Sequence, residues 1–525
     1  MTHSDPLWAG ATDKERGKFE SNLLLQYVPF TNQPLQTFHW IFRIKEDQDH
    51  TRAARLVLLG NRMVPGRDFN PDKTYCGNVN SGSFKLATAI AAKYKLGMKK
   101  GDLVGAYLIA KADPQYPIYA HTPVGWVKKP GHVMKIMKNV YGAPPAGNIF
   151  GTHVAAIVTG EGFISCPFDP KFYWKWLDML PILFVIHSDD FIMYLRDQHM
   201  YVWDSMIKSM NTAGYGVQDR DGHDFVGVTI KNTEDGGYVL NQRQAIEKII
   251  KTLGSVGAEP ERLPYPSVQV CPESLSLQDG LSKFPDLDPE VRKECISYPY
   301  RSAVGALLYV MIYTVPTIMF ILNVSSRYCN DPGPRHVFFM KHLIRYMNGI
   351  RFDEIVYSPH EGPYDIETMT ALLQIEYYVD SDHAGDKDKL RSQSCFISFM
   401  AGCIIIWNSI RQNSLSSGSS DSDIKAINHT LKTDTISNIG LLNAIGFKQN
   451  PVIIYEDNMA AVFAARQPNM TKGLRHMELS EMYFKEKQEE GVIKVTKIGT
   501  KDNLADLGTK RLAWPDFARF ASVLV

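Results

Sequence analysis

Residues 181–194 (PILFVIHSDDFIMY) place two adjacent carboxylates between two short apolar runs. The first run ends at His187 and Ser188, Asp189 and Asp190 follow, and the second run begins at once. Apolar runs on both sides of a polar break predict two buried strands joined by a tight hairpin. Adjacent carboxylates at its tip repel each other unless a cation binds there, and hard divalent cations take Asp oxygens as ligands. An ordinary Asp-containing turn has the same local pattern, so the remaining chain decides between the two.

A further acid lies about eighty residues upstream, where residues 101–110 read GDLVGAYLIA. Asp102 opens an apolar run, and Tyr107 follows five residues later. This spacing, followed by the hairpin with its two acids, resembles the palm of a reverse transcriptase. Further motifs in the same order resemble the polymerase region of Ty1/copia-type retrotransposons over roughly residues 36–512. These motifs are WIFRIK (40–45), ARLVLLG (54–60), VYGAPPAG (140–147), a strand at 225–230 with the segment 238–250, YRSAVGALLY (300–309) and YVDSDHAGD (378–386).

The resemblance implies a multidomain chain with α+β and α/β parts. We expect a right-hand reverse transcriptase, with fingers, palm and a helical thumb or connection, followed by an RNase H-like α/β domain. The expected boundaries are 1–35 for a lead-in or polyprotein stub, 36–262 for fingers and palm, 263–372 for a linker with thumb and connection, and 373–525 for the RNase H-like domain.

Composition is that of an ordinary globular protein of 525 residues, with 44% hydrophobic and 22% charged residues. The net charge of +1 excludes a polycation, so a nucleic-acid partner must bind a local basic groove. Seven cysteines form no CxxC pair, which predicts neither a zinc site nor a disulfide framework and favours a reducing compartment. No apolar run reaches about eighteen residues and no leader pattern opens the sequence, so we expect no membrane span and no signal peptide.

Residues 37–61 alternate apolar segments with a polar turn at 47–51, which predicts a β-hairpin. In the resembled family this hairpin forms fingers over the incoming nucleotide. Arg52 and Arg55 follow the turn and are expected to contact the triphosphate, because phosphoryl transfer depends on positioning and charge stabilisation. Solvated surface arginines are the equal alternative for each.

Three aromatic side chains complete the substrate-binding residues that the resemblance implies. Tyr107 is expected to close on the sugar and exclude a 2′-hydroxyl, with a plain core tyrosine as the alternative. Tyr141 belongs to the Tyr-Gly turn of the motif at 140–147. His187 stands where the family has the tyrosine that supports the primer end.

Local patterns predict the elements between these motifs. Apolar residues at helical spacing indicate a helix over 83–96, and Pro, Ser and Asp mark a linker over 263–288. The aromatic segment 163–176 could stack bases, although core or loop is its commoner role. Further helices are expected over 199–215, 300–313, 317–328 and 336–348, and a hairpin over 225–240 that turns at 234–237.

A second set of acids follows in the C-terminal part of the chain. Asp380 and Asp382 end a predicted strand, Asp421 lies in the first turn of a predicted helix over 421–447, and Asp457 ends the strand VIIYED. Asp506 lies in NLADLGTKRL. By resemblance Asp380, Asp421, Asp457 and Asp506 match, in order, the four metal-binding acids of RNase H. Such a set can hold two Mg²⁺ ions, one to activate water and one to stabilise the leaving oxygen.

Several positions depart from the family pattern. The usual S-S-T-E-A-E reads Ser419-Ser420-Asp421-Ser422-Asp423, so the carboxylate is one methylene shorter, and Asp423 could replace Asp421. The palm hairpin has His187-Ser188 before its acids where the family has Tyr-Val. A decayed or domesticated, catalytically inactive nucleic-acid-binding remnant is therefore the alternative function. An unrelated metal-dependent nuclease would lack the spacing between Asp102 and Tyr107.

The resemblance implies an RNA-directed DNA polymerase with ribonuclease H activity. Asp102, Asp189 and Asp190 are expected to bind two Mg²⁺ ions, for which Mn²⁺ can substitute, and to align the primer 3′-hydroxyl with the α-phosphate. The implied partners are an RNA template, a DNA primer, the RNA–DNA hybrid and dNTPs, bound mainly through backbone and shape. The resemblance also implies cytoplasmic virus-like particles, with later nuclear entry for DNA integration.

Overall fold

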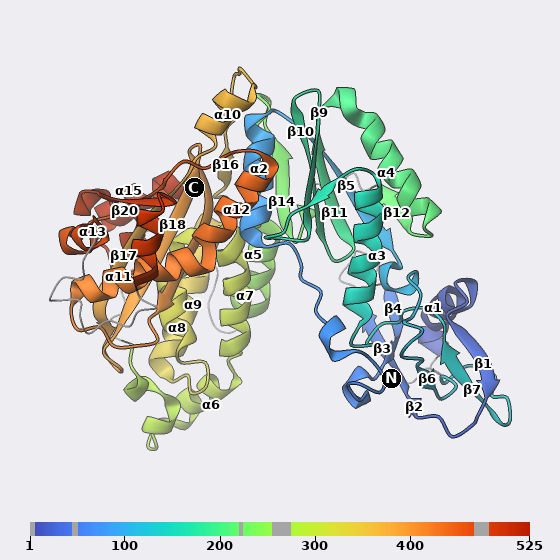
Figure 1. Cartoon of the computed structure of the whole chain (residues 1–525). Helices are drawn as coiled ribbons and strands as arrows, with labels where there is room; N and C mark the ends of the chain where they lie inside the picture. Colours follow the sequence, from blue (N-terminus) through green and yellow to red (C-terminus); the bar gives the residue numbers. More distant parts are fainter. Residues whose placement is uncertain (1–5, 45–50, 220–223, 255–274, 467–481) are drawn as a thin grey trace.

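The computed structural model describes residues 6–44, 51–219, 224–254, 275–466 and 482–525. Figure 1 shows two lobes that meet at α2 (Ser81–Lys93), with the first 220 residues mainly in one lobe and the last 160 in the other. The predicted helix over 83–96 is therefore confirmed as an element, although it begins and ends earlier.

A six-stranded sheet, which we call the palm sheet, carries the first acid motif. Its strand β10 (Leu180–His187) alternates its side chains between two cores, with Leu183 and Val185 facing α2 and Phe184 and Ile186 facing α3 (Ala146–Gly160) and α4 (Met200–Thr212). Burial on both faces explains why the sequence here is continuously apolar. The strand order is β12 (Gly216–Asp219), β5 (Gly97–Val104), β11 (Asp190–Leu195), β10, β9 (Phe172–Leu177) and β8 (Ile164–Ser165).

The N-terminal region outside the palm sheet, which we call the fingers region, contains the predicted hairpin, β3 (Phe38–Ile44) paired antiparallel with β4 (Arg52–Leu58). Residues 47–50 of its predicted turn lie outside the described residues. A lead-in was expected for residues 1–35, and this is wrong for the described part, because α1 (Ala9–Ser21) packs on β4 and buries Phe19 in the fingers core. A four-stranded sheet completes the fingers, in the order β1 (Leu25–Pro29), β7 (His132–Ile136), β6 (Tyr119–Ala120) and β2 (Leu35–Gln36).

The predicted helices after residue 289 are present: the one over 300–313 has the predicted bounds, and those over 317–328 and 336–348 have shifted ends. Part of the predicted linker, 263–274, lies outside the described residues, and its remainder contains the short turns η9 (Leu277–Asp279) and η10 (Leu281–Lys283). No helix within the described stretches is both long and apolar enough to cross a membrane. The helices are α5 (Arg243–Ile249), α6 (Pro289–Ser297), α7 (Tyr300–Tyr313), α8 (Met319–Ser326) and α9 (Pro334–Ile350).

A small sheet crosses the expected boundary between residues 262 and 263. It pairs β16 (Ile355–Tyr357) with β15 (Tyr238–Asn241), the second strand of the predicted hairpin. The two segments fold together because each supplies apolar side chains, such as Tyr238 and Tyr357, to one core. The sheet order is β13 (Asp224–Phe225), β14 (Val228–Asn232), β15 and β16.

The C-terminal part forms a mixed five-stranded sheet. Its central strand pairs antiparallel on one side and parallel on the other, as expected for an α/β unit. Helices α11 (Ser419–Thr430) and α12 (Ile436–Ile445), joined by a π-helical turn at Leu431–Thr435, replace the single predicted helix. The order is β19 (Cys403–Arg411), β18 (Arg391–Met400), β17 (Ile375–Asp386), β20 (Val452–Glu456) and β21 (Ile493–Lys497), and the other helices are α10 (Ile366–Leu372), α13 (Met459–Arg466), α14 (Tyr483–Glu489) and α15 (Trp514–Leu524).

One hydrophobic core joins the palm to the C-terminal sheet through α2. Lys85 of α2 is fully buried, donates a hydrogen bond from Nζ to the Ile312 carbonyl at 2.7 Å, and lies 3.4 Å from the ring centroid of Trp407 on β19. Trp407 in turn donates to the Met311 carbonyl at the end of α7. The two acid sets therefore lie in one packed body.

Candidate active sites

The palm acids lie at the tip of a two-strand hairpin. His187 of β10 pairs with Asp190 of β11, which leaves Ser188 and Asp189 as a two-residue turn. Ser188 has φ +54°, in the left-handed region that such tight turns require. Asp189 is exposed at the tip, and Asp190 is half-buried at the start of β11.

The third predicted palm acid lies directly across from the hairpin. Asp102 on β5 is the register partner of Asp190, and the Leu103 N–H donates to the Asp189 carbonyl at 2.9 Å. Directly opposite residues on a sheet have Cβ atoms about 4.5–5.5 Å apart. The strand register therefore brings together the three acids that the sequence separates by about 87 positions.

Gly101 makes room for the hairpin beside Asp102. It is the register partner of Phe191, and a Cβ atom at this position would lie 2.3 Å from the Phe191 ring. The Phe191 ring can therefore lie across β5 only where the facing residue has no side chain.

A cavity of about 390 Å³ opens beside the palm acids. Tyr107 lies on its wall, with its ring centroid 5.9 Å from that of Tyr141 and 5.1 Å from that of Phe150. Burial raises the pKa of the Tyr107 phenol, and a hydrogen bond with Ser188 partly opposes this rise. The cavity is large enough for part of a nucleotide. Tyr107 lies between the cavity and the core, and its packing against Phe150 holds the ring in place.

The Tyr141-Gly142 turn, which the sequence indicated, and Lys171, which it did not, also line this cavity. Burial raises the pKa of Tyr141 to about 12, and Gly142 after it has φ +87° with space for no Cβ, which would lie 2.2 Å from the Leu58 carbonyl. Lys171 also lines the cavity, beside Ser188. Sequence reasoning missed Lys171 because it stands in the aromatic segment 163–176, where no motif marks it.

The two predicted fingers arginines lie in different surroundings. The Arg55 guanidinium lies 5.5 Å from the ring centroid of Tyr141, which lines the cavity. The Arg52 guanidinium lies 5.9 Å from the ring centroid of Trp8, ahead of α1. Both side chains are exposed. Their ring contacts place Arg55 toward the cavity and Arg52 at the outer end of the hairpin.

His187 faces the strand β13 next to the palm. Its ring lies 6.4 Å from that of Phe225 in an edge-on arrangement. Burial lowers the pKa of the imidazole, and the nearby charge of Asp189 opposes that shift. The adjacent Val226 carbonyl accepts a hydrogen bond from the Tyr309 hydroxyl of α7, which ties this strand to the helical region.

In the C-terminal unit, Asp380 on β17 and Asp506 lie together in a buried position. The Thr509 hydroxyl donates to Asp380, and Lys510 forms an ion pair with Asp506 at 2.6 Å and lies 4.0 Å from Asp380. Burial and the neighbouring Asp380 raise the pKa of Asp506 to about 7, although Lys510 opposes the shift.

The structure places Asp423, and not Asp421, beside these acids. The Asp423 carboxylate accepts hydrogen bonds from Ser381 Oγ at 2.5 Å and Asn458 Nδ2 at 2.8 Å. Burial, with the charges of Asp380 and Asp457, raises its pKa to about 7.

Asp421 lies on another side of the same helix. Its carboxylate accepts from the Ser417 N–H at 2.7 Å and forms an ion pair with Lys425 at 3.3 Å. Residues two apart on a helix do not share a face, so Asp421 and Asp423 cannot both face β17. The choice of Asp421 as the helix acid is thus corrected to Asp423, the alternative that the motif left open.

The strand β20 brings two acids to this site. Asp457 follows the strand, half-buried, and acts electrostatically on Asp423. Glu456, the last residue of the strand, is fully buried, and sequence reasoning missed it. The alternation of Val452, Ile454 and Glu456 on the inward face was the signal that could have found it.

The acid sets have the chemistry of a magnesium site, although they are not closed around one. All the grouped donors are carboxylate oxygens, which Mg²⁺ prefers. Burial, together with the nearby charge of Asp380, raises the pKa of both Asp423 and Asp506 to about 7. Among the described residues, no three His, Cys, Asp or Glu side chains converge closely enough to hold an ion as they stand. Binding would therefore require rotation of side chains.

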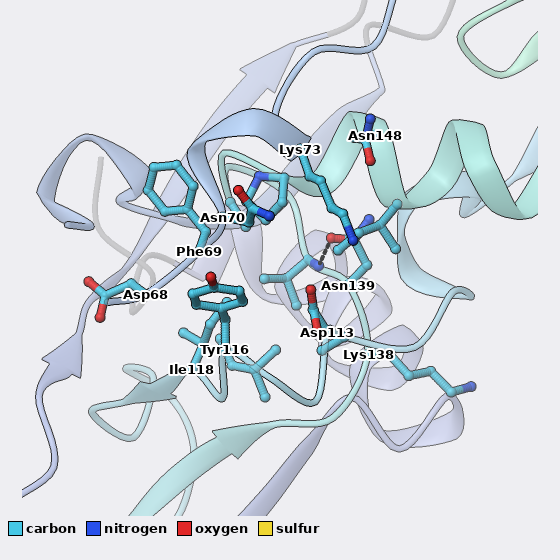
Figure 2. A pocket seen from close by; sticks show the side chains of 16 residues that line it. Asp68, Phe69, Asn70, Lys73, Asp113, Tyr116, Ile118, Lys138, Asn139 and Asn148 are labelled. Atoms are coloured by element: carbon cyan, nitrogen blue, oxygen red, sulfur yellow. Dashed lines mark hydrogen bonds between the residues drawn. The ribbon is translucent and has the colours of Figure 1, made fainter. Parts of the chain in front are cut away.

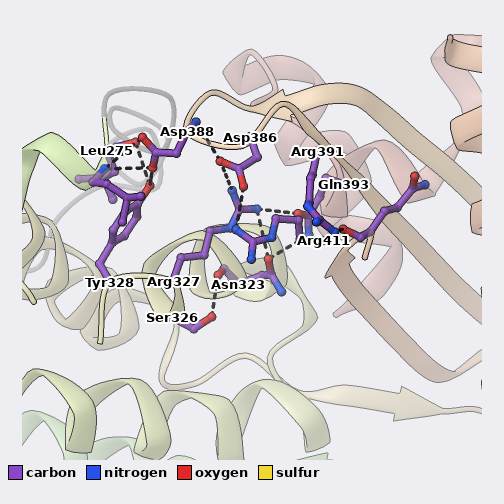
Figure 3. Close-up of polar contacts among 12 residues, drawn as sticks. Leu275, Asn323, Ser326, Arg327, Tyr328, Asp386, Asp388, Arg391, Gln393 and Arg411 are labelled. Carbon is purple, nitrogen blue, oxygen red and sulfur yellow. Dashed lines mark hydrogen bonds and ion pairs between the residues drawn. The ribbon is translucent and has the colours of Figure 1, made fainter. Parts of the chain in front are cut away.

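An ionic cluster fixes α8 to the strand that carries Asp380 (Figure 3). Asp386 forms ion pairs with Arg411 at 2.8 Å and Arg327 at 3.7 Å, and Arg327 also donates to Gln393 at 2.6 Å. Burial opposes the charge of Asp386, but the two arginines hold the pKa of its carboxyl below the ordinary value. The cluster positions β17 against the helices.

Figure 2 shows a second cavity, at the edge of the fingers core, lined by Asp68, Lys73, Asp113 and Tyr116 among others. Its volume is about 40 Å³, which holds one or two water molecules and no nucleotide. It lies apart from both acid sets, and we assign it no chemistry.

Comparison with known proteins gives a family match over the first half of the chain. Residues 24–266 match the family described as reverse transcriptase (RNA-dependent DNA polymerase). The chain is 24% identical over 496 residues to the Pol polyprotein from transposon TNT 1-94 of Nicotiana tabacum, covering 92% of this chain and 35% of that protein. It is 25% identical over 491 residues to the Pol polyprotein from transposon RE1 of Arabidopsis thaliana, covering 92% and 31%. The chain thus spans about a third of the length of these relatives.

Solved structures share the fold. A foamy viral protease-reverse transcriptase in complex with double-stranded DNA superposes with a TM-score of 0.52 at 13% identity, covering 94% of this chain and 69% of the viral one. The same viral protein with an RNA/DNA hybrid gives 0.51 at 12% identity, covering 95% and 54%. The expected reverse transcriptase fold is confirmed at this level.

Proposed function

Because the chain is a copia-type retrotransposon polymerase segment, we propose that it extends a DNA primer on an RNA template and cleaves the RNA strand of the resulting hybrid. The observation that carries the polymerase is the direct cross-strand pairing of Asp102 with Asp190, beside the cavity walled by Tyr107. A register-fixed carboxylate pair next to a cavity large enough for part of a nucleotide suits phosphoryl transfer, which depends mainly on positioning and charge stabilisation.

In this proposal each palm residue acts on the substrate or on a divalent cation. Asp102, Asp189 and Asp190 hold Mg²⁺, which when bound stabilises the charge of the attacking and leaving oxygens. Tyr107 packs against the sugar, and its ring leaves no space for a 2′-hydroxyl. Arg55 and Lys171 are the cations near enough to the cavity to contact the triphosphate.

For the C-terminal site we propose RNase H chemistry on Asp380, Asp423, Asp457 and Asp506. These carboxylates would hold Mg²⁺, and Lys510, paired with Asp506, would limit their repulsion before the ion arrives. Their shared packing with the palm through α2 keeps the two sites on one body, so a hybrid made at one site can reach the other.

The proposed partners are an RNA template, a DNA primer, their hybrid and dNTPs. Support comes from the fold relatives, which are described in complex with double-stranded DNA and with an RNA/DNA hybrid. With a net charge of +1, binding should depend on local basic groups and weaken steeply with salt.

Primer extension tests the polymerase. The assay uses poly-rA with an oligo-dT primer, Mg²⁺ and deoxythymidine triphosphate, with the intact chain beside Asp189→Asn/Asp190→Asn. We expect extension that falls by at least about a thousandfold in the double variant, equivalent to about 4 kcal/mol of transition-state stabilisation. Asp380→Asn is the matched control, because it removes an acid of the other site and should extend normally.

A catalytically inactive binding protein is the second candidate. It is favoured by His187, which packs edge-on against Phe225 where the family has a primer-supporting tyrosine. Folded protein that binds the hybrid but neither extends nor cleaves would establish it in place of the enzyme. His187→Tyr is then the first reversion to assay.

A further inference from the structure

Glu456 is a buried carboxylate that the proposed chemistry does not use. Its side chain is fully buried at the end of β20, on the same inward face as Val452 and Ile454. One oxygen, Oε1, accepts the Asn458 N–H at 2.9 Å. The other, Oε2, meets no hydrogen-bond donor among the described residues. A buried carboxylate oxygen without a partner is costly unless something outside the protein satisfies it.

This carboxylate faces the other acids of the C-terminal site. Its electrostatic neighbours are Asp423, Asp380 and Asp457. Asn458 links two of these groups, because its backbone N–H binds Glu456 and its side-chain amide binds Asp423 at 2.8 Å. The link fixes Glu456 and Asp423 beside each other.

The surroundings offer Glu456 no protein cation. Lys510 lies on Asp506 and Asp380, and the ion pairs of the described residues include none to Glu456. Asp423 has both oxygens in hydrogen bonds, to Ser381 and Asn458. Glu456 Oε2 is therefore a buried carboxylate oxygen of this group without a hydrogen-bond or ion-pair partner among the described residues.

We propose that Glu456 supplies a carboxylate oxygen to a divalent cation bound between β17, β20 and α11, beside Asp380 and Asp423. An aspartate such as Asp423 has one methylene fewer than a glutamate, and Glu456 brings a longer side chain to the same acids from β20. The inference rests on the proposed metal-dependent RNase H function and adds a residue to its site.

Mn²⁺ binding to the intact chain tests this role without relying on activity. The parent carries Asp189→Asn/Asp190→Asn to remove palm binding, and free Mn²⁺ is followed by electron paramagnetic resonance. Glu456→Gln keeps the shape and removes the charge, and we expect about tenfold weaker Mn²⁺ binding. Glu376→Gln is the matched control, because Glu376 is a half-buried glutamate on β17 that accepts from Tyr455 at 3.3 Å and lies outside the acid set.

The outcomes separate this inference from the function beneath it. Mn²⁺ binding by Glu456→Gln within twofold of the parent, beside a clear loss in Asp380→Asn, would overturn the role of Glu456 alone. No difference between the parent and Asp380→Asn would overturn the metal site itself, and Glu456 with it. If Glu456→Gln does not fold, judged by circular dichroism, Glu456→Asp decides, because its shorter side chain should also weaken binding and unchanged binding would refute the proposal.

Discussion

The palm acids and the C-terminal acids are placed by different physical means. In the palm, Asp102 and Asp190 are opposite each other because two strands pair in register, so the backbone alone sets their spacing. In the C-terminal unit, Asp380, Asp423 and Asp506 come from a strand, a helix and a short turn, and their side chains are held by Thr509, Ser381, Asn458 and Lys510. A register-set site tolerates side-chain changes around it, whereas a site held by side chains depends on each partner.

The sharpest test of this contrast replaces each of the two acids on α11 by asparagine, one at a time. Asp423→Asn should lower RNase H cleavage by about a thousandfold, because it removes a charge from the acid set. Asp421→Asn should stay within about threefold of the unchanged protein, because Asp421 pairs with Lys425 away from that set. Cleavage of a labelled RNA–DNA hybrid measures both, and primer extension by the same preparations shows that the palm is intact. A larger loss in Asp421→Asn than in Asp423→Asn would contradict the structure.

A second test asks whether Tyr107 acts at the palm cavity or only fills the core. Tyr107→Ala should raise incorporation of ribonucleotides relative to deoxyribonucleotides by about a hundredfold, since a lost steric contact of about 2–3 kcal/mol has this effect. Single-nucleotide extension with each substrate gives the ratio. Phe150→Leu is the control, because Phe150 packs on Tyr107 from the core. Lower activity with an unchanged ratio would assign Tyr107 to the core.

A third test disturbs the strand register itself. Gly101→Ala places a methyl group against the Phe191 ring, and overpacking of this kind costs about 1–3 kcal/mol of folding free energy. Polymerase activity should fall while hybrid cleavage changes little. Urea unfolding monitored by fluorescence measures the cost, and Gly10→Ala serves as control because its Cβ would meet nothing within 4 Å. Equal losses in both activities would show that the two sites do not respond separately to the palm.

The smallest effect concerns pH and metal removal. Folding raises the pKa of Asp423 and of Asp506 from 3.8 to about 7. A carboxyl with a raised folded pKa binds more protons in the native state, so stability is highest below the unfolded pKa and falls as pH rises toward about 7. With EDTA, the melting temperature should therefore fall between about pH 5 and pH 7.5. Mg²⁺ at the higher pH, or Asp423→Asn, should reduce that fall, and differential scanning fluorimetry measures it. A fall of the same size in Asp423→Asn would exclude this carboxyl as its source.

Local patterns predicted the elements that have a continuous apolar run or a clear helical spacing of apolar residues. The hairpin at 181–194, the helix α7 and the strands β17 and β20 of the C-terminal sheet follow from apolar runs and helical spacing alone. The first 35 residues were missed because α1 has little amphipathic pattern, although it packs on β4 and buries Phe19 against Phe38 and Trp126. The aromatic segment 163–176 was interpreted as core or loop, and the structure buries Phe172, Tyr173 and Trp174 in β9, beside β10.

By itself the sequence indicated the palm acids, because apolar runs on both sides of a short polar break predict two buried strands joined by a tight turn. Tertiary structure decided which helix acid faces the C-terminal site, because Asp421 and Asp423 differ only in the direction in which the helix turns them. Tertiary structure also decided which groups surround Glu456. The sequence places this residue at the end of a strand, but its charged neighbours include residues of β17 and α11. Position along one element is local information, whereas the groups that meet across elements depend on how those elements pack.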